Sequence, residues 1–193
     1  MKIGVLALQG DFAEHIYILH RIGVDVAEVR LPEQLVDLDG LIIPGGESTT
    51  IGKLAVAYNL LEPLQQFGQK KVIWGTCAGA IFLSKDVHRE QPLLDLMDIT
   101  VERNAFGRQI ASFEVDLDIP VLKTVDPEGS LYPAVFIRAP LIESVGKDTQ
   151  VLATLPDGRI VAAQQKRFLA TSFHPELTQD DRFHRYFLAM VKQ

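Results

Sequence analysis

The chain has 193 residues, a formal net charge of −6 and one cysteine, so it contains no internal disulfide and suits a reducing compartment. A domain of this length buries roughly 70% of the surface of its unfolded chain and needs no covalent staple. Scattered lysines and arginines argue against nucleic acid as a partner, and the absence of a long apolar stretch or signal peptide predicts a cytoplasmic protein without a membrane segment.

The first half of the chain alternates apolar strands with helices. Buried strands are predicted at residues 2–8, 24–29, 40–46 and 71–75. Helices are predicted over residues 11–23, 48–67 and 78–84. Asp11 and Glu14 form a capping-box pattern at the start of the first helix. This rhythm predicts an α/β domain with a largely parallel sheet.

The second half has a different pattern. Residues 112–119, "SFEVDLDI", alternate apolar and polar side chains, as in a strand with one face in water. Further strands are predicted at residues 134–139, 150–155, 159–165 and 167–173. A closing helix begins near Asp181. We therefore expect a central parallel sheet extended by antiparallel strands, in one domain over residues 1–193.

The cysteine lies in "GTCAG", residues 75–79, between an apolar strand and a helix. The G-x-C-x-G spacing is that of a nucleophile elbow, a sharp turn that exposes its central side chain. Gly75 and Gly79 leave room around the turn, and the amino-terminal end of the next helix favours the thiolate of Cys77. The alternative is a small cysteine buried in the core.

A nucleophilic thiol needs a base, and the chain has five histidines. Four fall in predicted helices or polar loops, where we expect solvated surface residues: His15, His20, His88 and His184. His174 instead ends an apolar strand, in "FHPEL". Because residues i and i+2 of an extended backbone project to the same side, Glu176 can bond one ring nitrogen while the other faces the thiol. Cys77, His174 and Glu176 are therefore the candidate catalytic residues; a capping histidine beside a surface glutamate is the alternative.

A third loop, "PGGEST" at residues 44–49, follows another predicted strand. Paired glycines let a backbone approach a ligand and present its N–H groups. The N–H groups of Gly46 and Ala78 would form an oxyanion hole, in which losing one donor typically costs about 100- to 1,000-fold in rate. A simple turn is the alternative. Loops after parallel strands gather at one edge of an open α/β sheet, so we expect the three loops to meet.

These loops resemble those of the class I, or triad, glutamine amidotransferase family. "GTCAG", "PGGEST" and "SFHPEL" carry this likeness. Four segments resemble the branch of glutaminase subunits of pyridoxal 5′-phosphate synthase: "LALQGDFAEH", "PGGESTT", "VERNAFGRQ" (101–109) and "VFIRAPLI" (135–142). The resemblance covers essentially the whole chain. It implies a three-layer, flavodoxin-like α/β fold with a mostly parallel central sheet, flanking helices and an antiparallel extension.

The family implies hydrolysis of L-glutamine to L-glutamate and ammonia, without a cofactor or metal. Cys77 attacks the side-chain carboxamide and forms a γ-glutamyl thioester, and His174 carries the thiol proton to the departing ammonia. By the same analogy six residues contact glutamine: Gly46, Glu47, Ser48, Arg103, Ile137 and Arg138. An arginine can hold the α-carboxylate and a glutamate the α-ammonium. The alternative for both arginines is an exposed salt bridge.

The sequence contains no P-loop, dinucleotide fingerprint or spare domain for an ammonia acceptor. Ammonia released into neutral water becomes ammonium and is no longer a nucleophile, so a small glutaminase that serves synthesis is expected to dock on another protein. The resemblance implies that this partner is the synthase subunit, which builds pyridoxal 5′-phosphate from a pentose phosphate and glyceraldehyde 3-phosphate. It also implies that the partner activates the glutaminase by ordering the loop at Gly45 and Gly46. Residues 9–15 are the candidate contact.

Three other functions stay open on the sequence. An ammonia-supplying subunit for imidazole-ring or purine synthesis would release glutamate with a different synthase. A cysteine hydrolase or peptidase would cleave peptides or esters and ignore glutamine. A flavodoxin-like binding module with a structural thiol would keep its full function after Cys77→Ala.

Overall fold

The computed structural model describes residues 1–103, 105 and 112–193. Within these residues a ten-stranded sheet has the order β2-β1-β3-β4-β12-β11-β9-β6-β5, with β10 paired to β11. The first five strands of this order are parallel: β2 (Asp25–Val29), β1 (Lys2–Leu6), β3 (Gly40–Ile43), β4 (Val72–Thr76) and β12 (Phe168–Thr171). β1, β3 and β4 are buried on both faces, which explains their continuous apolar sequences. The predicted parallel sheet is confirmed.

Beyond β12 the sheet becomes mostly antiparallel, as predicted. β11 (Ile160–Gln165) pairs antiparallel with β12. The remaining strands are β10 (Gln150–Thr154), β9 (Leu141–Val145), β6 (Met97–Glu102) and β5 (Ser84–Asp86). β5, β6 and β9 are not among the predicted strands.

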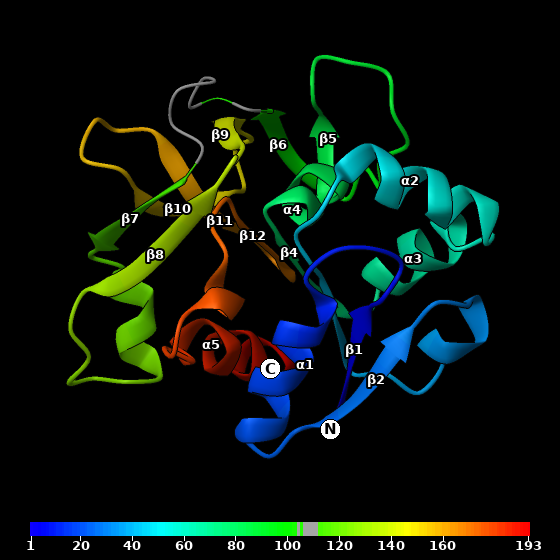
Figure 1. Cartoon of the computed structure of the whole chain (residues 1–193), viewed down its shortest axis with the longest axis horizontal. Coiled ribbons are helices and arrows are strands. Elements are labelled where there is room, and N and C mark those ends of the chain that lie inside the picture. Colours follow the sequence, from blue (N-terminus) through cyan, green and yellow to red (C-terminus); the bar gives the residue numbers. More distant parts are fainter. Residues whose placement is uncertain (104, 106–111) are drawn as a thin grey trace.

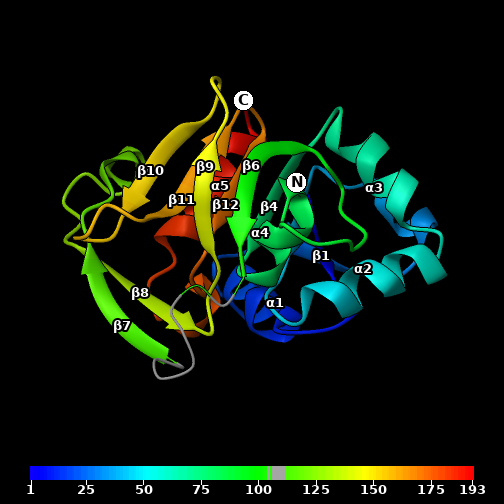
Figure 2. The same cartoon turned by 90° about the horizontal axis from the view of Figure 1, so that it is seen from above.

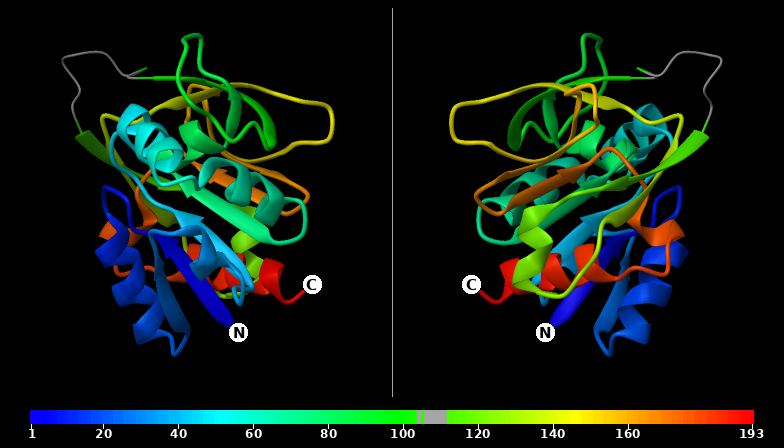
Figure 3. Two further views of the ribbon diagram at one scale, coloured as in Figure 1. Left: turned by 90° about the vertical axis from the view of Figure 1, so that its right-hand side faces the viewer. Right: turned by 90° about the vertical axis from the view of Figure 1, so that its left-hand side faces the viewer.

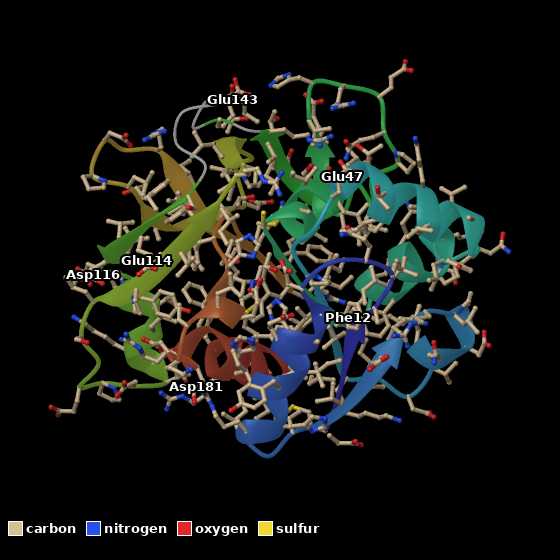
Figure 4. All side chains as sticks on the ribbon, viewed as in Figure 1. Phe12, Glu47, Glu114, Asp116, Glu143 and Asp181 are labelled. Carbon is tan, nitrogen blue, oxygen red and sulfur yellow. The ribbon has the colours of Figure 1, made fainter. Side chains whose placement is uncertain are left out.

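Two further strands form a separate antiparallel ribbon, β7 (Ser112–Leu117) and β8 (Tyr132–Ile137). Figure 4 labels Glu114 and Asp116 on β7, where both side chains are exposed, while Phe113 stacks on Phe136 with ring centroids 4.6 Å apart. The predicted one-sided strand is therefore present. Its partner β8 was expected in the central sheet, but the ribbon instead packs on the core beside α5.

Helices cover both faces of the sheet and give three layers (Figures 1 and 2). α1 (Phe12–Arg21) and α5 (Arg182–Val191) share one core, and the other face carries α2 (Ser48–Ala57), α3 (Leu61–Gly68) and α4 (Ala78–Leu83). Short 3-10 helices lie at η1 (Pro32–Leu35), η2 (Pro120–Thr124) and η3 (Pro175–Leu177). Alternate residues of β1 serve the two cores: Ile3 and Val5 pack with α1 and α5, whereas Leu6 packs with α2 and α3.

Two predicted helical features differ in the structure. The helix expected over residues 48–67 is two helices, α2 and α3, because the chain turns at Asn59, whose φ is +55°. Asn is one of the few residues that adopts this left-handed conformation readily. The predicted capping box at Asp11 is also wrong, since within the described residues the Asp11 side chain makes no capping hydrogen bond.

The parallel strands deliver their following loops to one edge of the sheet. In Figure 3 the start of β1 lies at the opposite edge, near the end of α5. Among the helices of the described residues, none combines the length and the apolar character that crossing a lipid bilayer requires.

Candidate active site

A cavity of about 510 Å³ opens at the carboxyl edge of the parallel strands. It is lined by every predicted site residue except Glu176, which lies behind His174. The loops that follow β1, β3, β4 and β12 all contribute to it, as the topology requires. This volume suits a small ligand such as an amino acid.

Cys77 lies between β4 and α4 with φ +48° and ψ −106°, a backbone conformation that L-residues rarely adopt. A Cβ on Gly79 would lie 1.9 Å from the carbonyl oxygen of Ile43, and one on Gly75 would lie 2.5 Å from the Gly79 backbone. The turn therefore requires both glycines. The structure has the strained strand-to-helix turn expected of an elbow, and the Cys77 side chain reaches the cavity.

His174 follows β12 and lies beside the Glu176 carboxylate at the cavity that Cys77 lines. Its Nδ1 lies 2.6 Å from Oε1 of Glu176, and His174 and Cys77 line the same cavity. Burial alone would lower the pKa of His174, but its interactions with Cys77 and Glu176 raise it to about 10. The ring is thus stabilised in its charged form beside the sulfur.

Glu176 is buried, and burial raises the pKa of its carboxyl, an effect that the contact with His174 opposes. The backbone between the two residues is not the extended segment predicted from the sequence: residues 175–177 form η3. The side chains nevertheless meet through this tight turn. Asp11, His174 and Glu176 place one ligand atom each within 4.8 Å of one another. Because the Nδ1–Oε1 hydrogen bond already uses two of these groups, we interpret the cluster as part of the predicted triad rather than a metal site.

Two oppositely charged side chains on the cavity wall, Glu47 and Arg103, form an ion pair. Glu47, labelled in Figure 4, caps α2 and accepts hydrogen bonds from the backbone N–H groups of Thr49 at 3.2 Å and Thr50 at 2.7 Å. Nη2 of Arg103 donates to Glu47 at 2.9 Å. Partial burial raises the pKa of Glu47, but hydrogen bonds from Thr50, Thr49 and Arg103 outweigh it and lower the pKa to about 2. The carboxylate is therefore ionised at neutral pH.

Gln91 holds the arginine in place and is not among the predicted site residues. Its Oε1 accepts from Nη1 of Arg103 at 3.0 Å, and its Nε2 donates to Oγ of Ser48 at 3.3 Å. Gln91 lies in the loop after β5, and the sequence of that loop contains no motif that predicts a functional residue. In the predicted segment 101–109, Asn104 and residues 106–109 lie outside the described residues.

The loop of the two glycines is held by the loop after β1. The N–H of Asp11 donates to the carbonyl oxygen of Gly45 at 3.2 Å, and Oε1 of Gln9 accepts from the N–H of Glu47 at 2.7 Å. Gly46 has φ +146°, which only glycine adopts freely. Ala78, the other predicted oxyanion donor, begins α4 and lines the same cavity.

The last two predicted contacts lie on the rim formed by the end of β8. Ile137 is the final residue of that strand, and Arg138 follows it with φ +43°. Both line the cavity, so the structure gathers all six predicted glutamine contacts around it.

Two histidines expected at the surface are buried instead. His15 of α1 and His184 of α5 are both 0% exposed, and they contact each other behind Glu176. His20 and His88 are exposed, as predicted. The sequence does contain a signal that His15 is buried. His15 lies three residues before Ile18 and four before Leu19, so all three lie on the same buried face of α1.

Comparison with known proteins agrees with this geometry. The SNO glutamine amidotransferase family matches over residues 5–193. A protein of Herpetosiphon aurantiacus named pyridoxal 5′-phosphate synthase subunit PdxT is 57% identical over 98% of this chain and 100% of its own length. A Dehalococcoides mccartyi protein of the same name is 54% identical over 100% of this chain and 98% of its own. A crystal structure of a glutamine amidotransferase has a TM-score of 0.90 at 47% identity, covering 99% of both chains. The predicted fold class is confirmed.

Proposed function

The chain belongs to the SNO glutamine amidotransferase family, and we propose that it hydrolyses L-glutamine through Cys77, His174 and Glu176. The observation that carries this proposal is the position of the His174 ring, which is hydrogen-bonded to Glu176 and lines the same cavity as Cys77. The strained elbow and the adjoining cavity support it. We also propose that residues 1–193 act as one glutaminase domain, because both cores pack on one sheet.

In the proposed mechanism the thiol proton passes to Nε2 of His174, and the sulfur of Cys77 adds to the side-chain carbonyl carbon of glutamine. The C–N bond then breaks as Nε2–H protonates the leaving nitrogen, so ammonia departs and a γ-glutamyl thioester remains. Water next attacks the thioester and gives a proton to His174. The C–S bond breaks, and glutamate and the thiol form. Such proton transfers contribute typically about 100- to 10,000-fold.

The tetrahedral intermediates carry a negative oxygen, for which we propose the backbone N–H groups of Gly46 and Ala78. Both residues line the cavity beside Cys77. Donors aimed at a developing charge in a site with little water are usually the largest single contribution to such a reaction.

The charged pair at the start of α2 suits the free amino-acid end of glutamine. Glu47 supplies an anion for the α-ammonium, and Arg103 a planar cation for the α-carboxylate. Ser48, Ile137 and Arg138 complete the proposed contacts, all on the cavity wall. A zwitterion that inserts between Glu47 and Arg103 exchanges one ion pair for two.

The ammonia acceptor is proposed to be a synthase subunit that makes pyridoxal 5′-phosphate, because the relatives at 57% and 54% identity are named as subunits of that synthase. We propose that docking at the loop after β1 orders Gly45 and Gly46, which that loop contacts. His15 is buried, so the contact would use the exposed members of residues 9–15.

Glutamate release by the purified chain, with and without the synthase subunit, tests the proposal. We expect weak turnover by the chain alone and strong turnover in the complex, and labelling of Cys77 by a glutamine-mimicking electrophile. Strong turnover without the partner would refute the activation. Absence of hydrolysis in the complex would refute the glutaminase.

A further inference from the structure

A buried polar chain continues behind the triad. Nε2 of His15 lies 3.3 Å from Oε2 of Glu176 and 3.3 Å from Oγ1 of Thr76, and Nδ1 of His15 lies 3.0 Å from Nε2 of His184. His15, Thr76 and His184 are each 0% exposed. They come from α1, the end of β4 and α5, so three separate elements meet behind one carboxylate.

Both histidines are neutral at neutral pH. Burial lowers the pKa of His15 well below its usual value, and the electrostatic interactions with the His184 and His174 rings lower it further. Burial, followed by the charge of Arg21, lowers the pKa of His184 to about 3. Each ring therefore carries one N–H donor and one nitrogen acceptor.

The contacts then decide which nitrogen holds each proton. An ionised carboxylate only accepts, so the nitrogen that faces Glu176 is the donor Nε2–H of His15. Nδ1 of His15 must accept, and Nε2–H of His184 donates to it. The remaining nitrogen, Nδ1 of His184, is buried without a hydrogen-bond partner among the described residues, as expected of a lone pair directed into the core. The hydrogen bond between the two histidines thus has one donor and one acceptor.

We propose that His15 is a positioning residue for glutamine hydrolysis, whose Nε2–H faces the second carboxylate oxygen of Glu176 and stabilises its charge while the first oxygen holds His174. This inference rests on the proposed triad. Oε2 of Glu176 has no aligned hydrogen-bond partner among the described residues, and Nε2 of His15, 3.3 Å away, is the side-chain nitrogen that faces it. His15 therefore fixes the rotation of a carboxylate whose other oxygen orients the base.

Removing this donor has a chemical consequence beyond packing. A buried carboxylate that loses a facing N–H group becomes more basic and draws the Nδ1 proton of His174 toward itself. The imidazolium beside Cys77 is then less stable and less well oriented. We expect kcat to fall about 10- to 100-fold with KM little changed, a loss smaller than that of the base itself.

The alternative role is filling space, because the His15 ring also packs edge-on against Trp74 with centroids 5.6 Å apart. Amide variants separate the two roles. His15→Gln can place an N–H near the position of Nε2, His15→Asn places it near Nδ1 and too far from Glu176, and His15→Leu fills the site without a donor. His20→Leu, an exposed position on the same helix, is the matched control.

The experiment measures kcat and KM for glutamine in the complex with the synthase subunit, and alkylation of Cys77 by iodoacetamide against pH in the chain alone. We expect His15→Leu and His15→Asn to lose about 10- to 100-fold in kcat and to slow alkylation at pH 7 severalfold. His15→Gln and His20→Leu should stay within about threefold of the parent in both assays. Equal losses in His15→Gln and His15→Leu, or a parent-like His15→Leu, would overturn the inference.

Two outcomes remain interpretable when a variant or the parent fails. If thermal denaturation shows that His15→Leu does not fold, the comparison of His15→Gln with His15→Asn decides, because both are polar and smaller than histidine. If the parent complex does not hydrolyse glutamine, the proposed function fails. The alkylation profiles then still show whether the His15 donor controls the Cys77–His174 pair.

Discussion

Gly10 and Gly45 are in direct backbone contact: a Cβ placed on Gly10 would lie 1.8 Å from the carbonyl oxygen of Gly45. The same oxygen accepts a hydrogen bond from the N–H of Asp11 at 3.2 Å. The loop after β1 therefore sets the orientation of the Gly45 peptide, which precedes the proposed oxyanion donor Gly46. A substitution in the loop after β1 can therefore alter glutamine hydrolysis by moving the loop at Gly45 and Gly46.

Gly10→Ala is expected to abolish most glutamine hydrolysis in the complex, because the added Cβ displaces the Gly45 carbonyl. Gly23→Ala is the matched control: Gly23 has φ +78°, close to the +96° of Gly10, but no described atom lies within 4 Å of its added Cβ. Both variants carry the strain of a positive φ, about 1 kcal/mol. Urea denaturation should show a loss of that size for Gly23→Ala with unchanged kcat. Equal activity in the two variants would contradict the coupling of the loops.

The strain at Cys77 predicts that glycine is a more stable replacement than alanine at this position. Cys77→Ala keeps a Cβ at φ +48°, whereas Cys77→Gly adopts that conformation freely. Relief of about 1–3 kcal/mol of strain, less the entropy cost of glycine, should make Cys77→Gly about 1 kcal/mol more stable than Cys77→Ala. Both variants should be inactive in the glutaminase assay. Denaturant midpoints measure the difference, and a less stable glycine variant would show that the turn is unstrained.

Much of the fold could be predicted from the sequence because the central strands are buried on both faces. Such strands have to be apolar throughout, and their order with intervening helices specifies a parallel sheet. The meeting of Cys77 and His174 follows from that topology, although the two residues are 97 positions apart. The alternating sequence of β6, Met97–Glu102, also carried a readable signal. β5 has three residues, two of them exposed, and offers no pattern.

The buried histidines could not be predicted from residue type. His15 and His184 are polar, so composition places them at the surface, but their partners are each other and Glu176. These polar contacts form only after α1 and α5 pack on the same face of the sheet. The break at Asn59 has a similar origin, because burial of Leu60 requires a turn that helix propensity does not predict.

The ion pair of Glu47 and Arg103 predicts a selective loss of substrate binding. Arg103→Ala removes donors to Glu47, Gln91 and Thr49, and should raise KM for glutamine at least about tenfold, as expected for a lost charge-assisted hydrogen bond. kcat should change less, because Arg103 donates to Thr49, Gln91 and Glu47 and not to the triad. The control is Arg30→Ala, an exposed arginine paired with Glu28. An unchanged KM would assign the α-carboxylate to another group.

The buried histidines and the triad histidine predict opposite effects of pH on stability. The pKa of His184 falls from about 6.5 in the unfolded chain to about 3 in the fold, so the unfolded state binds one more proton between these values. The contribution of neutral His184 to the free energy of unfolding is therefore complete above pH 6.5 and is lost as the pH falls toward 3. The pKa of His174 rises to about 10, so its contribution is complete below pH 6.5 and is lost as the pH rises toward 10.

Urea denaturation from pH 4 to 10 measures how the free energy of unfolding changes with pH in the acid range, where His184 acts, and in the alkaline range, where His174 acts. His184→Gln can keep the hydrogen bond to His15 without titrating. It should therefore reduce the slope of unfolding free energy between pH 4 and 6 by about 1.4 kcal/mol per pH unit. His20→Gln, at an exposed position of α1, is the matched control. His174→Gln should instead flatten the decline above pH 7. An acid slope shared by His184→Gln and the parent would mean that His184 already binds a proton in the folded protein.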